Sequence, residues 1–243
     1  MKGIFVVRLE ILEYLSSFIT IALVYAVVTT FAGWFRAWVA LKVGDDTPAA
    51  LGFLSLNPVD HFDFFGAILF AFIGFGWGKT SPLNGAVLSH RRFSWLRIAA
   101  ANYADVLALF ILSFIMLTVQ LCIVGVSGVP LLLQGLITLR TAMPNMFFVW
   151  WPGLSTLAGT IGNIAMLVTR LSMVLSSIYF LMRSLDAAEF IFPRFGLFLN
   201  NLPLWGRMLF TFIILIFGSS FIYFFMIKML LLLSSAAATL IVG

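Results

Sequence analysis

The sequence predicts an all-α polytopic membrane protein that forms a single membrane domain over residues 1–243. Of these residues, 63% are hydrophobic and only 9% are charged. A water-soluble domain cannot bury so large an apolar fraction. The hydrophobic residues are also grouped into runs that are long enough to cross a bilayer as helices.

Four apolar runs predict four membrane-spanning helices. The first run, 12–41, contains no proline and is long enough to tilt in the bilayer. It lacks a small-residue cleavage site, so we expect a retained anchor, with residues 1–11 as an interfacial lead-in. Further spans are expected at about 98–124, 157–181 and 205–241.

Shorter segments connect these runs. Residues 43–60 are polar and rich in turn formers, and 50–56 within them form a candidate short strand. Run 64–77 is apolar, but a helix of about 14 residues is roughly 21 Å long and falls short of the roughly 20 residues that a span needs. We therefore expect a re-entrant segment or a short embedded helix there. Loops are expected at 79–97 and 183–204.

Charge and cysteine content narrow the class of protein further. The net charge of +5 indicates membrane topology and contact with lipids, not nucleic-acid binding. Cys122 is the single cysteine in the sequence, which excludes an internal disulfide and a Cys-based metal cluster. The irregular segment 125–155 contains an aromatic cluster that is typical of a membrane interface.

A series of short motifs between residues 32 and 84 carries the most specific signal. In order they are Ala37-Trp38-Val39-Ala40, Gly44-Asp45, Leu56-Asn57-Pro58, His61-Phe62-Asp63 with Gly66, Phe75-Gly76-Trp77-Gly78-Lys79 and Pro82-Leu83-Asn84. This series resembles the compact bacterial branch of the site-2 protease family, the intramembrane zinc metalloproteases. The resemblance implies a site-2-protease-like helical core. The residues that it assigns to structural positions are Asn57, Pro58, His61, Asp63, Gly66, Trp77 and Asn84.

The catalytic motif of that family is replaced in this sequence. The family carries HExxH before Ala-Trp-Val-Ala, with two zinc-binding histidines and a glutamate that activates water; here the position reads Ala32-Gly33-Trp34-Phe35-Arg36. The family's third ligand is an aspartate, best matched by Asp186. Catalytic zinc needs three protein ligands and an open position. The resemblance therefore leaves Arg36 and Asp186 as remnants of the metal site, with no catalytic residue, metal or cofactor expected.

A substitute metal site has few candidate ligands. His61, His90, Asp60 and Asp63 could contribute, but His61 and Asp63 belong to a non-catalytic motif of the family, and His90 is flanked by arginines. We interpret both histidines as polar groups at the membrane interface. No motif supports a serine triad or a phosphate-binding loop.

Four charged residues lie within the apolar runs: Arg36, Asp105, Arg170 and Lys228. Each is costly in lipid unless it is paired or solvated. We interpret Asp105 and Arg170 as a structural pair, with a transport path as the alternative. Arg36 is expected to replace the metal as the cation of the ancestral site. Its first candidate partner is Asp186 and its next is Asp105; alternatively, it snorkels to the interface.

The number of spans remains four or five on charge alone, since both arrangements satisfy the positive-inside rule. A common origin of Arg36 and Asp186 in one metal site requires both helix ends to lie on the same side, which favours four spans. We therefore expect both termini outside, with 43–97 and 183–204 facing the cytoplasm.

The sequence thus predicts a catalytically inactive site-2-protease-like membrane protein that acts as a structural or assembly subunit of a larger membrane complex. Three alternatives stay open: an active intramembrane metalloprotease with a rebuilt site, a transporter or channel subunit, and a regulator that sequesters substrates. The expected partners are other integral membrane proteins and lipids, and no nucleic acid. The expected location is the bacterial inner (cytoplasmic) membrane.

Overall fold

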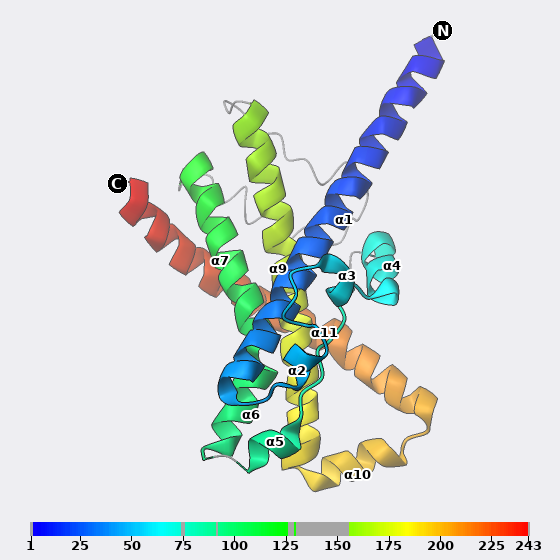
Figure 1. The fold of residues 1–243 in the computed structure, drawn as a ribbon. Helices are drawn as coiled ribbons and strands as arrows, with labels where there is room; N and C mark the ends of the chain where they lie inside the picture. Colours follow the sequence, from blue (N-terminus) through cyan, green and yellow to red (C-terminus); the bar gives the residue numbers. More distant parts are fainter. Residues whose placement is uncertain (1, 74–75, 91, 126–128, 130–155, 243) are drawn as a thin grey trace.

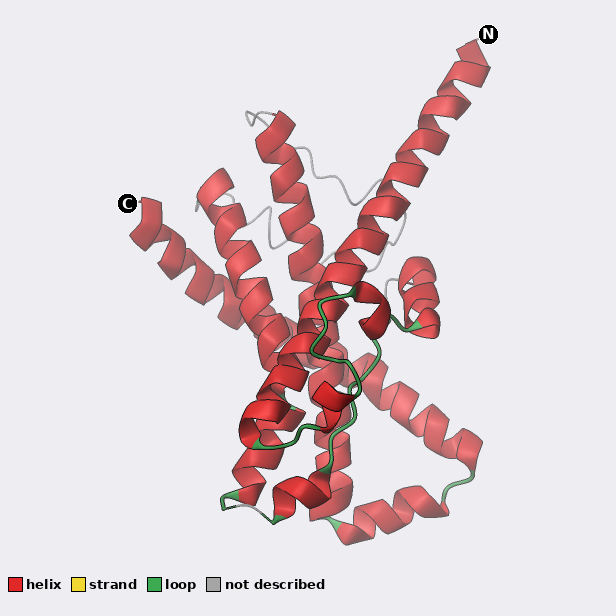
Figure 2. Cartoon of the chain, in the orientation of Figure 1, coloured by secondary structure: helices red, strands yellow, loops and turns green. Residues whose placement is uncertain are grey.

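The computed structural model describes residues 2–73, 76–90, 92–125, 129 and 156–242. Within these residues every regular element is a helix, as Figure 2 shows. The prediction of an all-α protein is therefore confirmed. The expectation for the irregular segment 125–155 falls outside the described residues, apart from 125 and 129.

Four long helices form the body of the molecule. They are α1 (Lys2–Val43), α7 (Ala104–Val124), α9 (Thr156–Ile191) and α11 (Leu204–Val242). Each contains a stretch that is long and apolar enough to cross a membrane, which confirms the expectation of four candidate spans. These stretches are Phe18–Val43, Ala104–Val124, Leu157–Leu185 and Phe217–Ile241.

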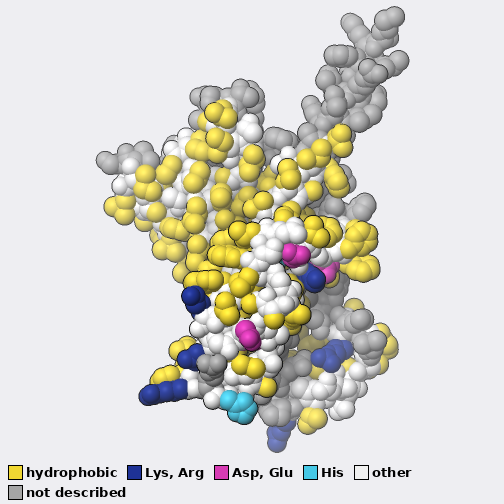
Figure 3. Space-filling view, in the orientation of Figure 1, with side chains coloured by type: hydrophobic (Ala, Val, Ile, Leu, Met, Phe, Trp, Pro, Cys, Tyr) yellow, Lys and Arg dark blue, Asp and Glu magenta, His cyan; other side chains and the backbone are white. Residues whose placement is uncertain are grey.

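Helix α9 lies at the centre of the bundle, where it contacts α1, α7 and α11. Both chain termini lie at one end, the upper end in Figure 1. The opposite end carries three short helices, α5 (Gly85–Ser89), α6 (Ser94–Asn102) and α10 (Pro193–Asn201). Figure 3 shows the described Lys, Arg and His side chains of this face in its lower half, below a largely hydrophobic upper half.

Close packing of small and branched side chains holds the helices together. Ala37 and Ala40 on α1 and Ala108 on α7 are fully buried, and such small residues let helices approach closely in a membrane, where apolar burial alone gives little preference over lipid. Two larger clusters fill the remaining space. One joins α1, α7 and α9 around Leu109, and the other joins α7, α9 and α11 around Ile227.

Several boundaries differ from the sequence-based expectations. Residues 1–11 do not form a separate lead-in, since α1 begins at Lys2. The loops expected at 79–97 and 183–204 are wrong, because they contain α5, α6, α10 and the end of α9. These helices have local start signals: the side chain of Asn84 accepts a hydrogen bond at the start of α5, and α10 begins with a proline, whose fixed φ suits the first turn.

The strand expected at 50–56 is also wrong. Residues Thr47–Ala50 form helix α2, with Pro48 in its first turn, and turns follow it. Gly52 has a φ of +86°, a left-handed conformation that glycine adopts without steric cost. Proline and glycine together therefore favour a helix and turn here over an extended strand.

The short apolar run forms a helix, α4 (Phe64–Ile73), which is too short to span a bilayer. It follows α3 (Pro58–His61), whose first turn is capped by Asn57: the side chain of Asn57 accepts a hydrogen bond from the N–H of Val59 at 3.2 Å. Helix α4 lies beside the middle of α1 (Figure 1), where the rings of Phe70 and Tyr25 stack at 5.4 Å.

Candidate functional site

A buried ion cluster joins three of the long helices. Oδ2 of Asp105, on α7, accepts hydrogen bonds from two guanidinium groups. Nη1 of Arg36, on α1, lies 3.0 Å from this oxygen, and Nη2 of Arg183, on α9, lies 3.1 Å from it. The side chains of Arg36 and Asp105 are each 4% exposed, and that of Arg183 is 11% exposed. One carboxylate therefore links α1, α7 and α9 away from solvent.

The local sequence explains how Asp105 reaches both arginines. Helix α6 ends at Asn102, the chain turns at Tyr103, and α7 begins one residue later, which divides the span expected at 98–124. Asp105 thus occupies the first turn of α7, where unpaired N–H groups and the helix dipole favour an anion. Nη2 of Arg36 also lies 3.5 Å from Oδ1 of Asn102. The last residue of α6 and the first turn of α7 therefore both contact the guanidinium of Arg36.

The structure pairs Arg36 with Asp105, which was its second candidate partner. The side chain of Asp186, the first candidate, lies outside the described residues. Arg183 was not identified from the sequence, because the third span was expected to end at 181. Its spacing from Asp186 could have identified it. Arg183 precedes Asp186 by three residues, which places both positions on one face of a helix that continues past the apolar run.

The expected pair of Asp105 with Arg170 is wrong. Arg170 lies 13 residues before Arg183 on the same helix, which separates the two by about 20 Å along its axis. Arg170 instead lies near Tyr223 of α11. Lys228 is exposed on the face of α11 that points away from the other helices. These positions give no support to a transport path through the intramembrane charges.

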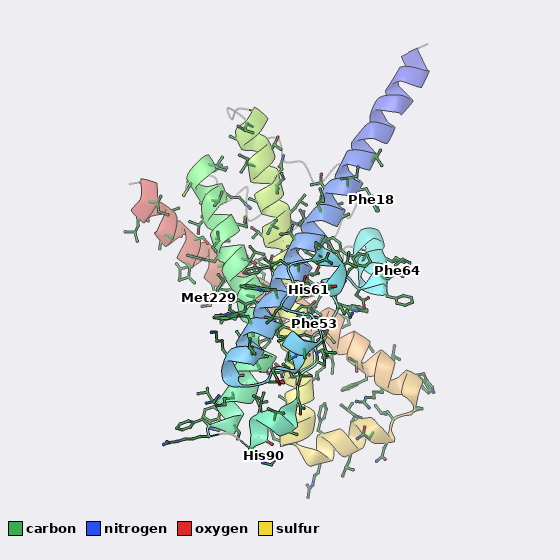
Figure 4. All side chains as sticks on the ribbon, viewed as in Figure 1. Phe18, Phe53, His61, Phe64, His90 and Met229 are labelled. Carbon is green, nitrogen blue, oxygen red and sulfur yellow. The ribbon has the colours of Figure 1, made fainter. Side chains whose placement is uncertain are left out.

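Next to the cluster, Gly33 of α1 packs against the imidazole of His61. A Cβ atom at Gly33 would clash with Nδ1 of that ring. His61 is fully buried, its Nε2 lies 2.8 Å from the carbonyl oxygen of Ser55, and its ring meets that of Phe53 edge to face. The expectation that His61 is an interfacial polar group is therefore wrong. His90 is exposed at the end of α5, and Figure 4 shows it at the lower end of the molecule.

The non-helical residues 76–79 contact both α1 and α9. Oη of Tyr25 donates a hydrogen bond to the carbonyl of Trp77. The N–H of Gly78 donates to Oη of Tyr179 at 2.9 Å. One tyrosine hydroxyl from each helix therefore hydrogen-bonds to a backbone group of this segment that has no partner within a helix.

The remaining motif residues shape the segment that follows α1. Oδ1 of Asp63 accepts a hydrogen bond from the N–H of Gly66 at 2.7 Å. Gly66 lies so close to the backbone of Trp77 that a Cβ would overlap its carbonyl oxygen. The N–H of Asn84 donates to Oδ2 of buried Asp45 at 2.7 Å. These contacts join parts of the segment to one another, and helices α2, α3 and α4 within it pack against α1.

The ion cluster does not fit a zinc ion. Arg36 stands where the resemblance puts the second zinc-binding histidine, and a guanidinium has no lone pair to donate and stays charged. Arg183 adds a second cation beside the carboxylate of Asp105. Among the residues that the structure describes, no three His, Cys, Asp or Glu side chains gather as a metal site would require.

Fold and site together define an all-α membrane protein with four candidate spans and a buried arginine–aspartate centre. The chain has distant, partial homology to the Bacillus subtilis (strain 168) protein "Putative zinc metalloprotease YwhC", a site-2 protease family member. The two are 36% identical over 85 residues, which cover 35% of this chain and 39% of the length of that relative. No protein-family model and no solved structure matches the chain.

Proposed function

We propose that this protein is a proteolytically inactive relative of the site-2 proteases and serves as a structural or assembly subunit of a larger complex in the bacterial inner membrane. The observation that carries the proposal is the ion cluster of Arg36, Asp105 and Arg183. One member of the cluster, Arg36, stands where the resemblance puts the second zinc-binding histidine, and its guanidinium would supply positive charge in place of a zinc ion. In this proposal the ion cluster holds together helices that the metal would hold in an active protease.

The contact between Gly33 and His61 supports the same proposal. By the resemblance, Gly33 stands where the family has the glutamate that activates water. The imidazole of His61 fills the space next to the Gly33 Cα, so a glutamate side chain has no room unless His61 moves. A helical bundle in which this position is filled by a neighbouring side chain suits a scaffold better than a protease.

We also propose that the short apolar run expected at 64–77 belongs to a re-entrant segment, which leaves α1 near Asp45 and returns near Asn84. Asp45 and Asn84 are hydrogen-bonded to each other, so the segment leaves and returns at one end of α1. Its middle reaches Tyr25, which contacts both Phe70 and Trp77. Tyr25 lies 18 residues before the end of α1, or about 27 Å along the helix. The tyrosine hydrogen bonds to residues 76–79 supply what buried non-helical backbone needs at membrane depth.

Isolation of the tagged chain from its native membrane in a mild detergent tests the proposed function. A structural subunit co-purifies with other integral membrane proteins at a fixed stoichiometry, without stoichiometric zinc and without cleaving transmembrane peptides. Stoichiometric zinc together with peptide cleavage would refute the proposal in favour of a rebuilt protease. A partner that appears only transiently would favour the substrate-sequestering regulator.

A further inference from the structure

One face of α11 points away from the bundle and carries a lysine among large apolar side chains. Its exposed residues recur about every four positions, which aligns them along one side of the helix. They are Phe217 at 73%, Phe221 at 77%, Phe225 at 65% and Leu232 at 71% exposure, together with exposed Lys228. We call these five residues the outer face of α11.

Lys228 lies deep within its candidate span. It is the twelfth residue of Phe217–Ile241, about 17 Å from one end and about 20 Å from the other along the helix axis. The preceding residue, Ile227, packs in a cluster with Leu117 of α7 and Met173 of α9, which lie inside their own spans. In Figure 4 the following residue, Met229, lies at mid-height of the molecule.

A lysine in this position needs a partner, because a charged side chain facing hydrocarbon is costly. The ring of Phe224 lies 4.6 Å from Nζ of Lys228 and offers a cation–π contact. Among the described residues, no carboxylate lies within salt-bridge distance of Lys228. The four-carbon stem of lysine is also much shorter than the distance to either end of the span, so Lys228 does not reach a headgroup.

We propose that the outer face of α11 binds a transmembrane helix of a different protein, and that this helix carries an aspartate or glutamate at the depth of Lys228. The partner's carboxylate would pair with Nζ, while its apolar residues would pack against the exposed phenylalanines. A second copy of this chain is a poorer occupant, because the carboxylate within its described spans, Asp105, is buried and paired with two arginines. This inference rests on the proposed function and names the class of partner.

The test uses the full chain, donor-labelled and reconstituted in phosphatidylcholine vesicles with acceptor-labelled synthetic transmembrane peptides. One peptide is an all-leucine span, one carries a single central Glu, and one a single central Lys. Energy transfer should report about tenfold stronger association with the Glu peptide than with the leucine peptide, the magnitude typical of one polar contact between membrane helices. Lys228→Met should abolish the difference, and Lys228→Glu should prefer the Lys peptide.

Lys42→Met is the matched control, because Lys42 also lies over an aromatic ring, that of Trp38, but at the end of a span. Its binding of the Glu peptide should equal that of the unmodified chain. Equal association with the Glu and leucine peptides would overturn the proposal. Self-association that Lys228→Met abolishes would also overturn it, because the outer face of α11 would then bind a second copy of this chain. Binding of phosphatidylglycerol alone that depends on Lys228 would overturn it as well. A complex that survives Lys228→Met in native membranes would refute this interface and leave the proposed function standing.

Discussion

Nη1 of Arg36 and Oδ2 of Asp105 lie 3.0 Å apart, although the two residues are 69 positions apart in the chain. Their pairing fixes the end of α1 against the start of α7, and Arg183 adds α9 to the same oxygen. Buried ion pairs are rarely a large net gain, since desolvation offsets much of the attraction. Their main consequence is that neither partner tolerates loss of the other.

Loss of one partner is therefore expected to destabilise the protein strongly. Arg36→Met leaves a buried carboxylate with one cation fewer, and Asp105→Asn leaves two guanidinium groups without their shared anion. Asp105→Asn should lower the free energy of unfolding by roughly 3–5 kcal/mol. Arg36→Met should lower it by less, because Arg183 still pairs with the carboxylate. Reversible unfolding in mixed detergent micelles measures the change. The double variant should lose less than the sum of the single variants, because the two residues are coupled. Additive losses would contradict the pairing.

The contact of Gly33 with His61 predicts that an alanine at position 33 destabilises the protein, whereas an alanine at an open glycine position does not. Gly33→Ala should destabilise the protein by about 1–3 kcal/mol, because the new Cβ overpacks against the buried imidazole. Gly85→Ala is the matched control, because no atom lies near a Cβ there and the residue is also helical; it should be neutral or slightly stabilising. His61→Ala should relieve part of the Gly33→Ala defect. Equal unfolding energies for the two alanine variants would refute the contact.

The tyrosine contacts to residues 76–79 predict local exposure after deletion of a hydroxyl group. Tyr179→Phe leaves the N–H of Gly78 without the acceptor that lies 2.9 Å away, which should cost about 1–3 kcal/mol. Hydrogen exchange of the Gly78 amide should accelerate in this variant. Tyr103→Phe is a control, since its hydroxyl contacts Ser184 and no part of this segment. Unchanged exchange at Gly78 would argue against a buried, side-chain-satisfied backbone here.

The proposed topology gives a further measurable expectation. In a Cys122→Ser background, single cysteines at positions 90 and 240 should be labelled from opposite sides of the membrane, with position 90 accessible from the cytoplasm. His90 is exposed and lies at the lower end of the molecule in Figure 4. Leu240 is exposed near the end of α11, next to the C-terminus that Figure 1 shows toward the upper end. Labelling of position 90 from the side of the N-terminus would contradict the four-span arrangement.

The sequence predicted those features that depend on run length. The four long helices were found because apolar runs of that length have few other structures available. Helix ends were less predictable, since caps and aqueous contacts extend helices beyond their apolar runs. For that reason Arg183 was assigned to a loop, although it completes the ion cluster on α9.

Contacts between distant segments could not be predicted from the sequence. The burial of His61 depends on the space left by Gly33, 28 positions earlier, and neither residue indicates the other. The break at Tyr103, which puts Asp105 in a first turn, likewise has no proline or glycine to mark it. Arg36 was recognised as a buried cation by resemblance, but its partner was set by how α7 packs against α1.

Restoring the family motif should not restore a metalloprotease. The variant with Ala32→His, Gly33→Glu and Arg36→His recreates HExxH, but two obstacles persist. The imidazole of His61 occupies the space that a side chain at 33 requires.

The second obstacle is that Arg183 keeps a cation 3.1 Å from Asp105, beside the place where the resemblance puts the metal. We therefore expect the triple variant to remain without stoichiometric zinc by elemental analysis and without cleavage of a transmembrane peptide. Adding His61→Ala and Arg183→Met should raise zinc binding above that of the triple variant, because these changes remove the steric and the electrostatic obstacle. Stoichiometric zinc in the triple variant alone would contradict this prediction. It would show that neither His61 nor Arg183 prevents zinc from binding at this position.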